Sequence, residues 1–267
     1  MPTRDDMLTE LGLVPTWRLR AGGAARKPDR SRSPQEPPQQ APGAVPEIAT
    51  ASAPTAAAQD NEIGSRRSER IAALEWRDFA ADVDACTACG LARTRKKSVP
   101  GVGDIHAEWL FVGEAPGSEE DARGEPFVGQ AGKLLDNMLA ALGMKRGENV
   151  HIANVLKCRP PSNRPPESRE IEACRPYLDR QIALIQPKLI VALGKSAATT
   201  LLDTDASIAS LRGRVHRYQG VPLVVTYHPA YLLRNLPEKA KAWEDLLFAR
   251  RTLLGAGAAD NPGAGGR

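Results

Sequence analysis

Hydrophobic residues are distributed unevenly along the 267-residue chain. Between residues 21 and 65 only three bulky aliphatic residues occur, among Ala, Pro, Gln, Ser and charged residues. Such a segment buries too little apolar surface to offset the entropy that it would lose on ordering. The pattern therefore predicts four parts: a short apolar N-terminal segment (1–20), a disordered Ala/Pro-rich linker (21–65), one globular domain (66–254) and a disordered tail (255–267).

Short, almost continuous apolar runs within the domain predict β-strands that are covered on both faces. The four runs are 109–112, 150–155, 189–193 and 221–226. Helical periodicity between and around them predicts helices near residues 71–83, 134–142, 171–185, 196–202 and 243–254. Because strands separated by helices pair in parallel, the predicted fold class is α/β, a three-layer α/β/α sandwich with a central, mainly parallel four-stranded sheet.

The first residues carry a second, separate hydrophobic pattern. Over residues 5–20, Met, Leu and Trp side chains can line one side of a helix and its extension. Two interpretations remain open: a terminal helix that packs on the core, or a peptide that docks a protein partner from the end of a flexible linker.

Charge and hydropathy narrow the function classes. The formal net charge of +4 permits nucleic-acid binding without requiring it. The chain has no run of 18 apolar residues, and acidic residues stand near its start where a signal peptide would be basic. We therefore expect a cytoplasmic protein without a membrane segment.

The only four cysteines are Cys86, Cys89, Cys158 and Cys174. The CxxC pair offers two thiolates to one metal centre, and the other two residues could complete its ligands. The alternative is that Cys174 is a small core residue and Cys158 a free thiol. Spacing alone leaves both zinc and a 4Fe–4S cluster open.

Candidate ligand-binding residues follow three of the predicted strands. A loop that begins Gly113-Glu114 and contains Phe127 follows the first strand, at the end where open α/β sheets bind ligands. Asn154 ends the second strand, and its amide can both donate and accept a hydrogen bond at the edge of a base. His228 follows the fourth strand and could stabilise negative charge on a leaving group.

The segments GEAPGSEEDARGEPFVGQAGKLL, NVLKCRPPSNRPP and HPAYLLRN, with the four cysteines in order, closely resemble the iron–sulfur-containing family 4 uracil-DNA glycosylases. The resemblance covers roughly residues 85–247. It implies that the four cysteines hold a 4Fe–4S cluster with a structural role. It also implies ordinary turnover, because a related branch that is trapped covalently has a His-containing insertion after the second strand that is missing here.

The same resemblance implies a role for each candidate in base recognition. Phe127 would stack on the flipped uracil, with Gly113 in the same substrate site. Asn154 would bond to the O4 and N3 edge of the uracil, and Glu120 would collide with the methyl group of thymine. His228 would donate a hydrogen bond to the uracil O2 as the glycosidic bond breaks.

Further residues are assigned to water and DNA. Glu114 would position the attacking water or stabilise the cationic sugar. Leu232, Leu233 and Arg234 would bind DNA, with a leucine filling the vacated stack and the arginine on the backbone, and nearby arginines such as Arg164 could meet phosphates.

We thus expect a monomeric enzyme that flips uracil out of single- or double-stranded DNA and hydrolyses its N-glycosidic bond. One alternative is a catalytically weak iron–sulfur DNA-binding protein associated with replication. Another is a zinc-stabilised nucleotide-binding protein.

Overall fold

The computed structural model describes residues 56–259, with side chains from 64 to 255, so the predictions for residues 5–20 lie outside the described residues. Helix α2 (Ala56–Ala72) begins inside the stretch predicted as linker, and α10 (Glu238–Ala259) extends past the predicted domain end at 254. Helical structure thus extends beyond the predicted domain, 66–254, at both ends. Alanine has the highest helix propensity, so Ala-rich sequence at each end continues a helix that composition alone suggested was absent.

A mixed sheet of six strands forms the centre of the described region, in the order β1-β3-β2-β4-β6-β5. Its four inner strands are parallel to one another. They are β2 (Trp109–Gly113), β3 (Val150–Asn154), β4 (Leu189–Leu193) and β6 (Val221–Thr226). These are the four strands predicted from the apolar runs, and the sequence-based bounds differ from them by at most one residue.

Two short strands that were not predicted form the edges of the sheet. β1 (Val102–Gly103) pairs antiparallel with β3, and β5 (His216–Tyr218) pairs antiparallel with β6. The prediction of four strands is therefore corrected to six. β1 has only two residues and β5 is the polar segment His-Arg-Tyr, so neither produces an apolar run.

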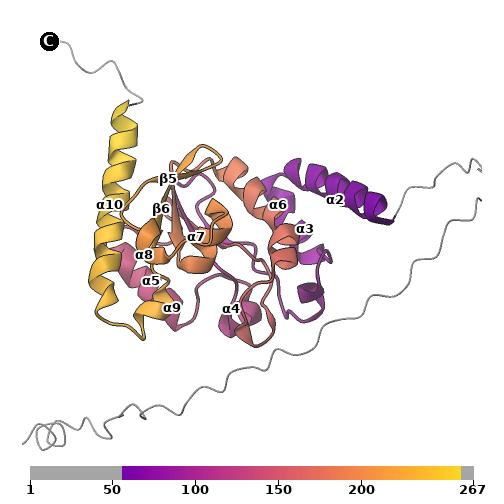
Figure 1. Ribbon diagram of the computed structural model, residues 1–267, viewed down its shortest axis with the longest axis horizontal. Coiled ribbons are helices and arrows are strands. Elements are labelled where there is room, and N and C mark those ends of the chain that lie inside the picture. Colours follow the sequence, from indigo (N-terminus) through magenta and orange to yellow (C-terminus); the bar gives the residue numbers. More distant parts are fainter. Residues whose placement is uncertain (1–55, 260–267) are drawn as a thin grey trace, which may run out of the picture. The chain divides into compact units, whose positions relative to one another are not determined.

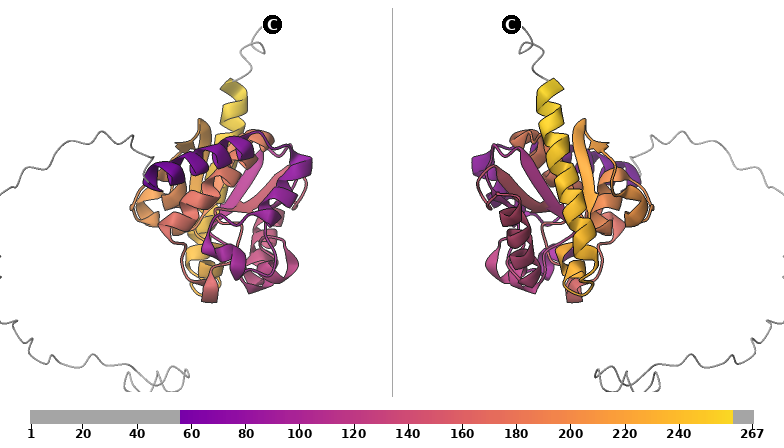
Figure 2. Two further views of the ribbon diagram at one scale, coloured as in Figure 1. Left: turned by 90° about the vertical axis from the view of Figure 1, so that its right-hand side faces the viewer. Right: turned by 90° about the vertical axis from the view of Figure 1, so that its left-hand side faces the viewer.

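Helices cover both faces of the sheet, as the sandwich prediction required (Figures 1 and 2). On one face, α5 (Gln130–Ala141) and α10 pack through leucines against Phe111 and Val191. On the other face, α6 (Ser168–Ile185), α7 (Lys195–Leu202) and α8 (Ile208–Leu211) pack against Leu110 and Ile190. Successive residues of each inner strand thus enter opposite cores, which is why these strands are hydrophobic throughout.

The helix predicted near residues 71–83 is two helices, α2 and α3 (Trp76–Ala85). The backbone leaves the helical path after Ala72, and the Arg180 guanidinium donates a hydrogen bond of 2.6 Å to the carbonyl of Leu74. Ile71 and Phe79 then share one buried cluster with Tyr177 of α6. A contact from a distant helix therefore satisfies a carbonyl that the break exposes.

Short helical turns occupy the loops that surround the site. They are η1 (Gly90–Arg93), α4 (Ser118–Arg123), η2 (Pro161–Asn163) and α9 (Pro229–Leu232).

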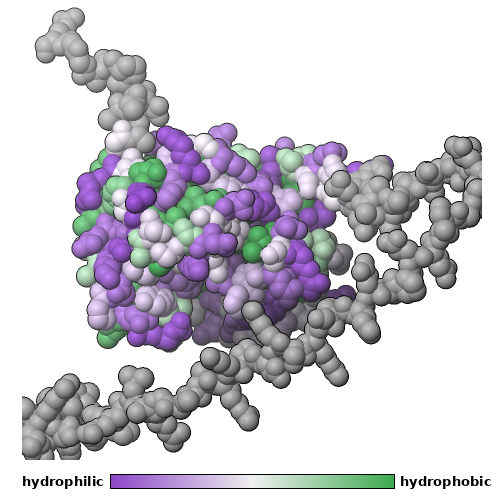
Figure 3. Space-filling model, viewed as in Figure 1, coloured by the Kyte–Doolittle hydropathy of each residue, from purple (hydrophilic) through white to green (hydrophobic). Residues whose placement is uncertain are grey.

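The face in Figure 3 is mostly hydrophilic, with hydrophobic side chains in separate patches. Among the described helices, none has the length and hydropathy needed to cross a membrane.

Candidate active site

The carboxyl ends of β2, β3 and β6 open into one cleft of about 450 Å³. Parallel strands place these ends at one edge of the sheet, where Gly113 of β2 lies in register with Asn154 of β3. Six of the predicted site residues line the cleft: Glu114, Glu120, Phe127, Asn154, His228 and Arg234. The structure thus brings together residues that lie up to 120 positions apart in the chain.

Asn154 is 2% exposed, and its side-chain oxygen Oδ1 has no hydrogen-bond partner in the described structure. A buried amide oxygen without a partner is costly, so this atom is suited to accept a hydrogen bond from a ligand N–H. Gly113 explains how the amide fits. A Cβ there would lie 2.4 Å from Oδ1 and 2.6 Å from Cζ of Phe127, so Gly113 backs both groups without lining the cleft.

The His228 ring is oriented by its own backbone segment. Its Nδ1 accepts a hydrogen bond of 3.1 Å from the amide of Ala230, which leaves Nε2 as the protonated nitrogen of the neutral ring. Burial, with a smaller effect of the Arg234 charge, lowers the pKa of His228 to about 4. At neutral pH the ring is therefore an uncharged hydrogen-bond donor.

The close position of His228 also depends on a glycine. Gly194 has a φ of +90°, and a Cβ on it would come within 2.8 Å of the His228 Cβ. The His228 ring lies 5.5 Å from the Phe127 ring, with 30° between the planes. An aromatic ring and an imidazole donor thus share one part of the cleft.

The Glu120 carboxylate binds three backbone amides. It accepts hydrogen bonds from Gly117 at 3.1 Å, Val128 at 2.9 Å and Gly129 at 3.0 Å. These contacts tie α4 to the loop that carries Phe127. Glu120 therefore presents a side chain of fixed position to the cleft.

Glu114 lines the cleft directly after β2. Burial raises the pKa of its carboxyl group, and interaction with Ser196 at the start of α7 partly opposes that rise. Its backbone carbonyl accepts a hydrogen bond from Leu156, which extends the pairing of β2 with β3. The backbone bond to Leu156 and the interaction with Ser196 thus hold Glu114 at the carboxyl end of β2.

The three residues predicted to bind DNA have different environments. Leu232 is 1% exposed and packs against Tyr227 and Ala242, so the structure places it in the core and not on the surface where DNA was expected. Leu233 is 42% exposed, and Arg234 is exposed at the cleft. Leu232 occupies the inward-facing position of α9, which a run of two leucines does not reveal.

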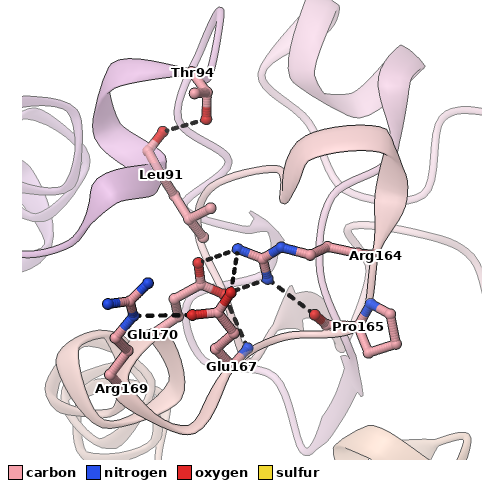
Figure 4. A network of polar contacts seen from close by, with 7 residues as sticks. All are labelled: Leu91, Thr94, Arg164, Pro165, Glu167, Arg169 and Glu170. Atoms are coloured by element: carbon pink, nitrogen blue, oxygen red, sulfur yellow. Dashed lines mark hydrogen bonds and ion pairs between the residues drawn. The ribbon is translucent and has the colours of Figure 1, made fainter.

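Arg164 also lines the cleft, but carboxylates engage it (Figure 4). Its guanidinium makes two parallel hydrogen bonds to Glu170, at 2.6 and 2.9 Å, and an ion pair of 3.1 Å with Glu167. Glu170 in turn accepts a hydrogen bond from the Glu167 amide at the start of α6. In the described structure the Arg164 guanidinium therefore fixes the loop before α6, and its contact with phosphate stays a prediction.

All four cysteines line a small cavity that is separate from the cleft. Cys86 ends α3, Cys89 precedes η1, Cys158 lies in the loop after β3 and Cys174 is in α6. The described structure has no group of three His, Cys, Asp or Glu side chains that would hold a single metal ion. The thiols therefore surround a shared space rather than converge on one point.

Basic groups and a backbone amide approach these sulfurs. Arg95 lies 2.9 Å from the Cys158 sulfur, and the Lys157 amide lies 3.2 Å from the Cys174 sulfur. Burial nevertheless raises the pKa of the Cys158 thiol, and raises that of Cys174 to about 12. These donors and this burial suit a cationic centre that would hold the sulfurs as thiolates.

The structure reveals a supporting residue that the sequence analysis missed. Lys157 is 1% exposed, and its ammonium donates to the carbonyl of Asn154 at 2.8 Å and to the side chain of Gln181. Burial lowers the pKa of Lys157 to about 8. Lys157 is flanked by Leu156 and Cys158, and a lysine between apolar residues was the one available signal.

The sheet, the cleft at its carboxyl edge and the cavity of four cysteines define a member of the uracil DNA glycosylase superfamily, whose family model matches residues 100–247. The type-4 uracil-DNA glycosylase of Archaeoglobus fulgidus is 47% identical over 164 residues, which cover 58% of this chain and 82% of that protein. That of Thermotoga maritima is 46% identical over 155 residues, covering 57% and 80%. The type-5 uracil-DNA glycosylase of Pyrobaculum aerophilum is 32% identical over 155 residues, covering 52% and 68%. This chain belongs to the type-4 uracil-DNA glycosylases, as the sequence motifs indicated.

Proposed function

We propose that the protein removes uracil from DNA by hydrolysing the bond between the base and C1′ of its sugar, leaving an abasic site. The observation that carries the proposal is the unpartnered, buried Oδ1 of Asn154 in the same cleft as the Phe127 ring and the His228 donor. The relatives at 46–47% identity are named for activity on uracil-DNA.

Uracil matches the three groups of the cleft. Its N3–H would donate to Oδ1 of Asn154 while the amide nitrogen donates to O4. Cytosine has an acceptor at N3 and would leave that buried oxygen unpaired, which costs binding energy. Phe127 would cover one face of the flipped base.

Bond cleavage places negative charge on the uracil and positive charge on the sugar. The Nε2–H of His228 would donate to the uracil O2, and this contact strengthens as charge develops. The carboxylate of Glu114 would orient a water molecule toward C1′ and stabilise the cationic sugar. The water oxygen then bonds to C1′ and gives up a proton to the Glu114 carboxylate. The base leaves with the bonding electrons and takes a proton from solvent.

Glu120 is proposed to exclude thymine. A hydrophobic pocket alone discriminates a methyl group by only about 1–3 kcal/mol. Because three amides hold the Glu120 carboxylate, the side chain would have to give up hydrogen bonds to make room for a methyl group at C5. A side chain held in place in this way excludes thymine more strongly than a mobile side chain would.

We further propose that Cys86, Cys89, Cys158 and Cys174 hold a 4Fe–4S cluster. When bound, the cluster would bridge four thiolates and fasten α3, the loop after β3 and α6 to one another, without taking part in hydrolysis. The cavity lined by all four cysteines supports one shared centre, and the family resemblance favours a cluster over zinc. Iron and sulfide analysis of the purified protein distinguishes the two, since a zinc protein contains neither.

The decisive experiment measures base excision on oligonucleotides with one uracil, thymine or cytosine, scored as strand cleavage by alkali. Wild-type protein should cleave only at uracil. His228→Ala and Asn154→Ala should each lower single-turnover excision by at least about 10²-fold while keeping fold and iron content. The exposed residues His106 and Asn137 provide matched controls, His106→Ala and Asn137→Ala, which should keep full activity.

Two results would overturn the proposal. Full activity of both cleft variants would show that the assigned cleft is not the site. Folded wild-type protein that binds DNA without excising uracil would indicate the DNA-binding alternative.

A further inference from the structure

The backbone of Phe127 adopts an uncommon conformation. Its φ is +55°, in the left-handed region that residues other than glycine rarely occupy. Such a conformation persists only where surrounding groups hold it, and such positions cluster at functional sites. The side chain that the conformation directs into the cleft is 6% exposed.

The turn around Phe127 (residues 126–129) is held from two sides by contacts with Glu120 and with α5. On the following side, the amides of Val128 and Gly129 donate to Glu120. On the side of α5, the Phe127 carbonyl lies directly over Gly132, where a Cβ would come within 1.7 Å of the carbonyl oxygen. These contacts fix the amides and leave the carbonyls of the turn to a third group.

That third group is Arg146, which follows α5 and does not line the cleft. One guanidinium nitrogen donates to the Pro126 carbonyl and another to the Phe127 carbonyl, each at 2.8 Å. The Nε donates a hydrogen bond of 3.0 Å to Asp136 of α5, so the Asp136 carboxylate sets the plane of the forked guanidinium group. The Arg146 side chain is 22% exposed, which reduces competition from water.

We propose that Arg146, oriented by Asp136, is a positioning residue for base recognition, which holds the Phe127 ring in its stacking position through the two carbonyls. Arg146 contacts neither the base nor the sugar in this proposal. Its planar fork binds two carbonyls at once, which a single ammonium cannot reproduce. The role of the ring in stacking rests on the function proposed above. The hydrogen bonds by which Arg146 holds the turn, called here the grip of Arg146, do not depend on that function.

The grip is tested by hydrogen exchange in the full chain with Arg146→Met. Amide exchange in residues 125–129 should rise at least about tenfold, with no change in the inner strands. Lys145→Met is the matched control, because Lys145 is the adjacent, exposed basic residue and pairs only with Glu148. Equal exchange in wild type and Arg146→Met would overturn the grip, whatever the protein does to DNA.

Coupling to the ring is tested by combining Arg146→Met with Phe127→Ala. Alone, Arg146→Met should lower uracil excision about tenfold and weaken inhibition by free uracil to a similar extent. In the Phe127→Ala background the same change should cost less than about twofold, because no ring remains to be positioned. An equal loss in both backgrounds would overturn the positioning role and indicate a general effect on the fold.

Two milder variants guard against a misfolded double variant. Arg146→Lys should recover part of the excision rate, and Asp136→Asn should give an intermediate loss with the guanidinium intact. Failure of wild-type protein to excise uracil would refute the proposed function and leave the hydrogen-exchange result to decide the grip. Wild-type activity in Arg146→Met would refute the positioning role alone.

Discussion

Leu232, the last residue of α9, and its neighbour Leu233 should respond to alanine substitution in opposite ways. Leu232 is 1% exposed and packs between Tyr227 and Ala242, whereas Leu233 is 42% exposed at the end of the helix. Truncating a buried leucine removes transfer energy and leaves a cavity, which costs about 2–5 kcal/mol. For a domain of this size each kcal/mol lowers Tm by about 2–4 °C. We therefore expect Leu232→Ala to lower Tm by about 4–20 °C.

Leu233→Ala should leave Tm within about 2 °C of wild type but lower the rate of uracil excision from duplex DNA. If Leu233 fills the gap left by the flipped base, its remaining apolar surface contributes about 1 kcal/mol on binding. That energy corresponds to about a fivefold change in rate. A single strand has no opposing stack to fill, so its excision should change less than about twofold.

The assay compares single-turnover excision from a duplex and from the same strand alone, with thermal melting of each variant. An equal loss of excision on both substrates would show that Leu233 does not act in the vacated stack. A wild-type Tm for Leu232→Ala would contradict its place in the core.

Three further changes test other parts of the site. Burial raises the pKa of Glu114 above its ordinary value of 4.5, and activity is lost as the pH falls through that pKa. In a plot of excision rate against pH, the loss of activity on the acid side should therefore have its midpoint above pH 4.5. A midpoint near pH 4 would assign this loss to His228 instead. Gly113→Ala should lower excision at least about tenfold with a normal melting curve, because its Cβ would collide with Asn154, while Gly64→Ala in open space should have no effect on excision. Cys158→Ser should lower iron content and Tm together, and a variant with full iron would remove Cys158 from the proposed ligands.

The inner sheet and the positions of the site residues were predictable because both depend on local sequence. β2, β3, β4 and β6 are buried on both faces, so each is a nearly continuous apolar run. Residues that follow such parallel strands meet at one edge of the sheet, so the strand pattern predicts that Glu114 and His228 lie close together, and both line the cleft.

The remaining features depend on tertiary contacts that no local pattern records. The break between α2 and α3 is satisfied by Arg180, more than 100 residues away. Arg164 binds Glu170 through two hydrogen bonds, and the sequence alone does not predict this pairing. Arg146 lies 19 positions from the carbonyl of Phe127, and nothing in the intervening sequence predicts their contact.

The two edges of the sheet limit how the protein can associate with itself. β1 has two residues and β5 has three, and each runs antiparallel to its neighbour. An incoming strand from another copy would find only one or two free pairs of backbone groups on either side, too few to seed a continuous intermolecular sheet. The long parallel strands, which are the aggregation-prone part of the sequence, are thus shielded by short edge strands. At high concentration the folded protein should therefore resist fibrillar assembly through the edges of its sheet.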